Sequence, residues 1–198
     1  MFVTFEGVDG SGTTTQSELL RQHLEESGRE VVLTREPGGT VLGERVREFV
    51  LGDTEISPWA EAALFAAARA ELVAEVIQPA LERGADVVCD RYLDSSLAYQ
   101  GIARGLGVER VLALNLEAIR GILPDVTFLL VVDPEEAQRR SGPPRDRIER
   151  EGDAFLRQVD QAYRELAAMF SGRIVTIDSS RAVEEVAKEV RDKLPGLS

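Results

Sequence analysis

The segment from Gly7 to Thr15 has the residue types and spacing of a phosphate-binding loop. It matches the pattern G-x-x-x-x-G-K-[ST] at every defined position except the lysine, which Thr13 replaces. Glycines in such a loop adopt positive φ, so that backbone N–H groups converge on phosphate oxygens. Thr14 stands where a hydroxyl binds Mg²⁺. The predicted phosphate-binding residues are Gly7, Gly10, Ser11, Gly12, Thr13, Thr14 and Thr15.

The loop needs a strand before it and a helix after it. The apolar run Phe2 to Phe5 predicts a short buried strand, and leucines at helical spacing predict a helix over 16–26. A glycine-rich turn that binds no ligand is the alternative, and this flanking pattern favours the phosphate site. The only lysines are Lys188 and Lys193, so an arginine is the expected substitute for the missing positive charge.

A second group of chemically active residues follows two other predicted strands. Asp90 ends the run from Val87 to Cys89, where a carboxylate can support Mg²⁺ or, equally, cap a helix. Arg91 comes directly after it, and a turn over 35–39 follows another apolar run. Ligands of parallel α/β sheets bind at the carboxyl ends of the strands, so these segments and the loop are expected to form one site. Thr14 and Asp90 are the candidate metal ligands.

The elements that must position this site predict the fold class. Apolar runs of strand length recur at 2–5, 31–33, 87–89, 126–132 and 174–177, separated by helical segments. Continuous apolarity is typical of strands buried on both faces, so we expect an α/β fold with a doubly wound, five-stranded parallel sheet flanked by helices. A helix is predicted over 58–83, with Ser57 as its N-cap and a kink at Pro79.

Length and charge limit the function further. The 198 residues fit one domain, 1–198. The 35 acidic and 23 basic residues give a net charge of −12, which argues against nucleic acid or an anionic membrane as the main partner. The single cysteine, Cys89, the lack of a long apolar run and the strand beginning at the N-terminus predict a cytoplasmic location without a signal peptide.

Four features in order along the chain resemble the bacterial thymidylate kinases, which are P-loop nucleoside monophosphate kinases. They are the loop with Asp9 inside it, the turn T-R-E-P-G-G over 34–39, the segment from Asp90 to Gly101, and D-R-I-E over 146–149. The resemblance implies phosphoryl transfer from ATP to thymidine monophosphate, Mg²⁺ as cofactor and a homodimer. Thr13 departs from the family pattern, which has lysine there.

The resemblance also implies roles for individual residues. Asp9 would contact the sugar hydroxyl or the phosphate region, Arg91 would hold the acceptor phosphate, and Glu36, with its neighbour Pro37, would orient the acceptor. Phe65 would stack on thymine, although core packing is the alternative for this side chain. The remaining implied contacts are Arg69 with a thymine carbonyl, Ser96 and Gln100 with the base, and Tyr99 against C2′ of the sugar.

An arginine-bearing segment over about 139–149 is the last candidate. Gly142 and the two following prolines predict a loop, where the family has a lid that closes over ATP, and Arg140 and Arg145 are the candidate catalytic arginines. A solvated charged surface is the alternative. Arg181 follows the last predicted strand, where the family binds adenine, but an ordinary surface turn would have the same composition.

Two other functions remain open from the sequence. Another small-molecule kinase of this fold would keep the loop without needing Phe65, Arg69 and Tyr99 together. A catalytically impaired nucleotide-binding protein is the second possibility, and Thr13 is its only support.

Overall fold

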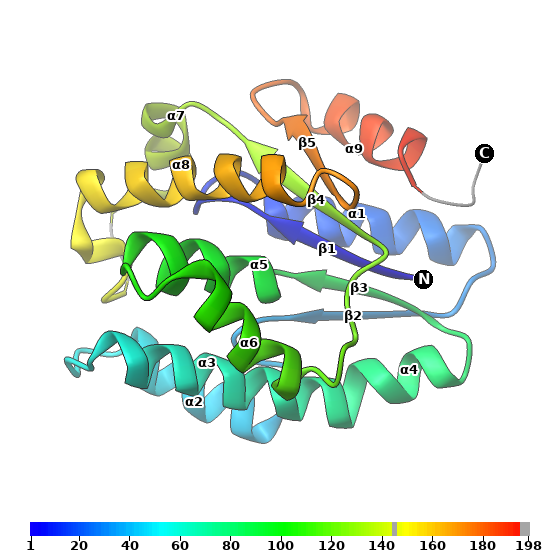
Figure 1. Ribbon diagram of the computed structural model, residues 1–198. Coiled ribbons are helices and arrows are strands. Elements are labelled where there is room, and N and C mark those ends of the chain that lie inside the picture. Colours follow the sequence, from blue (N-terminus) through cyan, green and yellow to red (C-terminus); the bar gives the residue numbers. More distant parts are fainter. Residues whose placement is uncertain (144–145, 195–198) are drawn as a thin grey trace.

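A five-stranded parallel sheet with helices on both faces forms the protein (Figure 1). The computed structural model describes residues 1–143 and 146–194. The strands are β1 (Phe2–Glu6), β2 (Val31–Arg35), β3 (Asp86–Asp90), β4 (Val126–Val131) and β5 (Ile174–Asp178). Their order is β2-β3-β1-β4-β5, and every neighbouring pair is parallel. The predicted fold class is confirmed, with each strand end within two residues of the predicted run.

Helices α1 (Thr13–Glu26) and α9 (Val183–Asp192) cover one face of the sheet. Leu20 and Leu24 of α1 are buried with Val186 of α9 against Phe5 and Phe128 of the central strands. These leucines are the helically spaced ones of the sequence pattern. The packing fixes the start of α1, and therefore the end of the phosphate loop, against the sheet.

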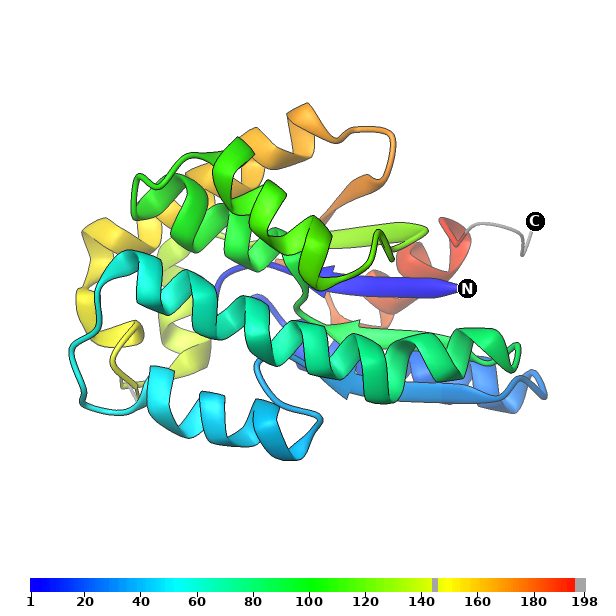
Figure 2. The ribbon, with the colours of Figure 1, turned by 60° about the horizontal axis from the view of Figure 1, so that its bottom comes forward.

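The other face carries a larger layer of helices. Its elements are α3 (Pro58–Leu72), η1 (Val73–Ile77), α4 (Gln78–Glu82), α5 (Leu93–Ser96), η2 (Leu97–Ala103), α6 (Val108–Ala118) and α8 (Asp153–Met169). Helix α2 (Val41–Leu51) lies beside α3 and packs Val46 and Val50 against Ala68 (Figure 2). Helix α7 (Pro134–Ser141) and the short turn η3 (Glu149–Glu151) lie near the carboxyl ends of the strands, at the left of Figure 1.

The helix predicted over 58–83 begins as expected but has its irregularity elsewhere. Ser57 caps it, with its side chain accepting a hydrogen bond from the N–H of Ala60. The irregularity lies before Pro79 rather than at it, because the chain forms the π-helical turn η1 just before the proline. Proline has no N–H and its ring crowds the carbonyl four residues earlier, so the preceding turn adjusts.

No helix in the described part of the chain is long and apolar enough to cross a membrane.

Candidate active site

The loop between β1 and α1 has the backbone that the glycines predict. Gly7, Gly10 and Gly12 have φ of 152°, 81° and 98°, in the region that favours glycine. A Cβ at Gly10 would lie 2.1 Å from the carbonyl oxygen of Ala137 in α7, so glycine also allows α7 to pack on the loop. Helix α1 starts at Thr13 and directs its N-terminus at the loop.

Thr14 and Asp90, the two predicted metal ligands, are in direct contact. The Thr14 hydroxyl donates to Asp90 Oδ2 at 2.5 Å, and the buried Asp90 Oδ1 accepts no hydrogen bond within the described residues. Tyr92, rather than Asp90, stands at the N-cap position of α5, so the structure disfavours the capping alternative. A hydroxyl and a carboxylate with one unpartnered oxygen suit Mg²⁺, which typically takes one or two carboxylates together with substrate phosphates.

Arginines surround the loop in place of the absent lysine. Thr13 is buried and lines an open cavity with Gly10, Ser11, Gly12, Thr14 and Thr15. The arginines that line the same cavity are Arg35, Arg47, Arg91, Arg140 and Arg181. The phosphate-binding segment therefore faces several cations that come from distant parts of the chain.

Of the two candidate catalytic arginines, Arg140 is the one that the structure describes. Its Nε donates to Glu136 at 2.8 Å, and its guanidinium also donates to the carbonyl of Ser179 at 3.0 Å. Arg181 pairs with the half-buried Glu189 and donates to the carbonyl of Asp178. Arg145, the other predicted catalytic arginine, lies outside the described residues.

Arg91 is held in a conformation that few residues other than glycine adopt. Its φ is 67°, directly after β3, and its N–H donates to the carbonyl of Phe5. The guanidinium donates to the carbonyl of Gly7, to the Tyr163 hydroxyl and to Asp9 at 2.6 Å. An unfavourable backbone conformation held by this many contacts is typical of functional sites.

The buried Glu6 anchors the segment that follows Arg91, and the sequence analysis did not identify it. Its carboxylate accepts hydrogen bonds from the N–H groups of Tyr92 and Ser95 and from the Ser95 and Tyr163 hydroxyls. Burial, together with the nearby Asp94, raises the pKa of Glu6 to about 7. Tyr163 contacts both Glu6 and Arg91, so the carboxylate helps to fix the arginine.

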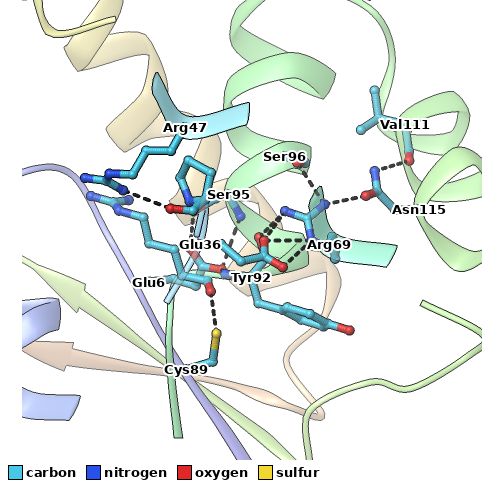
Figure 3. Close-up of polar contacts among 12 residues, drawn as sticks. Glu6, Glu36, Arg47, Arg69, Cys89, Tyr92, Ser95, Ser96, Val111 and Asn115 are labelled. Atoms are coloured by element: carbon cyan, nitrogen blue, oxygen red, sulfur yellow. Dashed lines mark hydrogen bonds and ion pairs between the residues drawn. The ribbon is translucent and has the colours of Figure 1, made fainter. Parts of the chain in front are cut away.

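Glu36 and Arg69 form a buried ion pair beside this network (Figure 3). Arg69 is 1% exposed and comes from α3, while Glu36 follows β2. Two N–H groups of the guanidinium donate to Glu36, and one each donates to Ser96, Asn115 and the carbonyl of Tyr92. All five N–H donors of an arginine are therefore occupied within the protein. The expected contact of Arg69 with a thymine carbonyl would require a shared donor.

A second cavity holds the predicted acceptor-binding residues together. It is lined by the nine residues to which the resemblance assigns acceptor contacts: Asp9, Glu36, Pro37, Phe65, Arg69, Arg91, Ser96, Tyr99 and Gln100. Phe65 is only partly buried and faces this cavity as well as the core. The lining residues that the sequence did not predict are Arg47, Leu51, Ser95, Asp146 and Ile148.

The two cavities meet. Asp9, Glu36, Arg47 and Arg91 line both of them, so a ligand at the loop and a ligand beside Phe65 would approach each other at these side chains. The geometry suits the transfer of a charged group between two bound anionic molecules.

Comparison with known proteins identifies the family. Residues 5–190 match the family model described as thymidylate kinase. The chain belongs to the thymidylate kinase family. The thymidylate kinase of Pelotomaculum thermopropionicum is 52% identical over 194 residues, which cover 96% of this chain and 90% of that relative. The thymidylate kinase of Bifidobacterium longum strain NCC 2705 is 48% identical and covers 100% of this chain and 98% of its own length.

A solved structure of the family has the same fold. The crystal structure of thymidylate kinase from Ehrlichia chaffeensis superposes with a TM-score of 0.79 at 35% identity, covering 96% of this chain and 95% of the other. The resemblance found in the sequence motifs is therefore confirmed over nearly the full length.

Proposed function

We propose that this chain transfers the terminal phosphoryl group of ATP to thymidine monophosphate and releases thymidine diphosphate. The observation that carries the proposal is the meeting of the two cavities at Asp9 and Arg91. A phosphate-binding loop on one side and a pocket with Phe65 and Tyr99 on the other match a nucleotide donor and a nucleotide acceptor. Membership of the thymidylate kinase family selects thymidine monophosphate as the acceptor.

The chemistry requires position and charge rather than a base. The attacking oxygen belongs to a phosphate that is already anionic, so catalysis consists of aligning the two phosphates and neutralising their charge. In the proposal, Arg91 holds the acceptor phosphate, and Asp9 restrains the arginine through their ion pair. The loop N–H groups and the N-terminus of α1 hold the phosphates of ATP.

Thr14 and Asp90 would hold Mg²⁺ together with ATP. The unpartnered Oδ1 of Asp90 supports this assignment. The described residues contain no cluster of three or more side chains that could hold a metal by themselves, so the phosphates must supply the remaining ligands. When bound, the ion would neutralise phosphate charge.

Base recognition would fall to the helical layer over the sheet. Phe65 would stack on thymine, Ser96 and Gln100 would contact its polar edge, and Tyr99 would lie against the sugar. Arg69 would act chiefly by holding Glu36 and Ser96 in place, because its own donors are occupied.

The positive charge that Thr13 cannot supply would come from the lid segment over about 139–149. Arg140 lines the loop cavity and is the first candidate, and Arg145 is the second. A lid arginine that approaches ATP on closure would act mainly in the transition state, and therefore on kcat.

The domain organisation, location and oligomeric state of the enzyme are also part of the proposal. A single domain over 1–198, a cytoplasmic location and a homodimer accord with the resemblance, and the net charge of −12 disfavours nucleic acid and membrane surfaces as partners.

The test is a coupled assay with ATP, Mg²⁺ and a panel of nucleoside monophosphates. The proposal predicts turnover with thymidine monophosphate, at a higher kcat/KM than with the cytidine or ribo-uridine counterparts. Equal rates with all pyrimidine monophosphates would favour a different kinase of this fold. ATP binding without turnover would favour the impaired nucleotide-binding protein that Thr13 suggests.

A further inference from the structure

Glu61 of α3 is a buried carboxylate that the proposed chemistry does not use. It is 1% exposed and collects three side chains from other elements. Its Oε1 accepts from Gln100 Nε2 at 2.8 Å and from Arg104 at 3.3 Å. Its Oε2 accepts from Arg104 at 3.2 Å and from Arg147 at 2.5 Å. One carboxylate therefore joins α3 to η2 and to the segment before η3.

These contacts keep Glu61 ionised. Burial alone would raise the pKa of Glu61, but the hydrogen bonds from Arg147, Gln100 and Arg104 outweigh it and lower the pKa below its ordinary value. An ionised carboxylate only accepts hydrogen bonds. The group that Gln100 turns toward Glu61 must therefore be its amide nitrogen.

This fixes which end of the Gln100 amide remains for a ligand. Gln100 is 2% exposed and lines the acceptor cavity beside Phe65 and Ser96. Its nitrogen is bonded to Glu61, and its Oε1 accepts no hydrogen bond from the described residues. A bound base would therefore meet a carbonyl oxygen, which is an acceptor only.

We propose that Glu61 is a positioning residue that sets base selectivity by locking the Gln100 amide with its oxygen toward the acceptor base. Thymine and uracil carry an N–H donor at N3, whereas N3 of cytosine is a bare acceptor. If the Gln100 oxygen cannot exchange places with the amide nitrogen, it can accept a hydrogen bond from N3–H of thymine or uracil. At N3 of cytosine it meets a second acceptor, which disfavours binding of that base. The inference rests on the proposed function, because it concerns the acceptor of that reaction.

Two arginines help Glu61 to hold the Gln100 amide in this orientation. Arg104 and Arg147 keep the carboxylate charged, and Arg147 is itself held by the carbonyl of Val50. Glu151 pairs with the same two arginines, at 2.8 Å and 3.8 Å, without a hydrogen bond to Gln100. It provides a matched control for the loss of a carboxylate from this cluster.

The test is the variant Glu61→Gln. A neutral amide both donates and accepts, so Gln100 can then present either end to the base. The ratio of kcat/KM for thymidine monophosphate to that for deoxycytidine monophosphate should fall by about 10-fold or more, the factor that about 1.4 kcal/mol of hydrogen bonding represents. The ratio of thymidine monophosphate to deoxyuridine monophosphate should stay as in the unaltered chain, because both bases carry N3–H.

The control variant and the two ratios distinguish a change in base selectivity from a general disturbance of the acceptor pocket. Glu151→Gln should leave both ratios unchanged. An unchanged thymidine-to-deoxycytidine ratio in Glu61→Gln, or an equal shift in both ratios, would overturn the inference. If Glu61→Gln does not fold, the double variant Glu61→Gln/Arg147→Gln, which removes opposite charges together, gives the same ratios with the same interpretation. Absence of thymidine monophosphate turnover in the unaltered chain would instead contradict the proposed function.

Discussion

The two halves of the site differ in how many of their polar groups are already paired. On the acceptor side, Arg69 has every donor occupied, and Glu6 accepts four hydrogen bonds. On the donor side, the buried oxygens Ser11 Oγ, Gln16 Oε1 and Asp90 Oδ1 have no partner within the described residues. The arginines there pair with partly exposed carboxylates, such as Arg140 with Glu136 and Arg181 with Glu189.

This difference indicates which half is formed before ligands bind. Side chains already held in place lose little conformational freedom on binding, so the acceptor pocket is suited to recognise its ligand with little rearrangement. The donor side would be completed by phosphate oxygens, a cation and a closing segment. Substitutions on the acceptor side should therefore affect stability and KM, and substitutions on the donor side should affect kcat.

The largest effect is expected from Arg69→Ala on the acceptor side. Removing the guanidinium leaves Glu36 buried without its partner, which should lower the free energy of unfolding by about 3 to 5 kcal/mol and raise KM for thymidine monophosphate. Urea unfolding measures the first effect. Arg181→Ala, which breaks an exposed pair, should cost at most about 1 kcal/mol. Similar losses of unfolding free energy in the two variants would contradict the contrast between the two halves of the site.

The next effect concerns Arg140 and the missing lysine. Arg140→Ala should lower kcat by about 10² to 10³, the usual cost of one transition-state donor, with little change in ATP affinity. Thr13→Lys should restore part of that loss. The matched control is Arg139→Ala, because Arg139 is 74% exposed and pairs with the same Glu136. Full kcat in Arg140→Ala would show that the charge comes from another group.

Arg91→Ala should follow in size. Loss of its contact with the acceptor phosphate should weaken acceptor binding by about 1.5 to 3 kcal/mol, as for a hydrogen bond to a charged group, while ATP affinity changes little. Isothermal titration with each nucleotide separates the two. Arg164→Ala is the control, since within the described residues Arg164 pairs only with Asp160 on the same helix. A collapse of ATP binding with intact acceptor binding would assign Arg91 to the other substrate.

The smallest effect is a change in the pH dependence of stability through Glu6. Its pKa rises from 4.5 to about 7 in the folded chain, so the folded state binds more protons than the unfolded state between these values. The free energy of unfolding must therefore fall as pH rises, by about 1 kcal/mol between pH 6 and pH 8. Glu6→Gln should lack this fall. Equal pH slopes in urea unfolding of the two proteins would contradict the assignment.

The sequence predicted the parts of the site that depend on local pattern. The glycines of the loop, Asp90 at the end of β3 and the buried strands follow from residue types and spacing, and the topology then brings Asp9 and Arg91 together. The acceptor residues were predicted from the motifs that the chain shares with the thymidylate kinases, and all of them line one cavity.

The partners of these residues could not be predicted in the same way. A buried Arg69 needs an anionic or carbonyl partner, but the sequence does not show which one, because Glu36 and Asn115 lie 33 and 46 residues away along the chain. Glu6 and Glu61 look like ordinary acidic residues in the sequence, and only tertiary packing makes them buried acceptors. The π-helical turns η1 and η2 likewise could not be predicted from the periodicity, and only η1 lies beside a proline, Pro79.

Hydrogen exchange of the full chain tests the contrast between the halves most directly. Thymidine monophosphate alone should slow amide exchange little over α3 and η2, because that pocket is already formed, whereas a non-hydrolysable ATP analogue with Mg²⁺ should slow exchange strongly over 7–15 and α7. Strong protection of α3 and η2 by thymidine monophosphate, with no change over the loop and α7 on adding the analogue, would contradict the account.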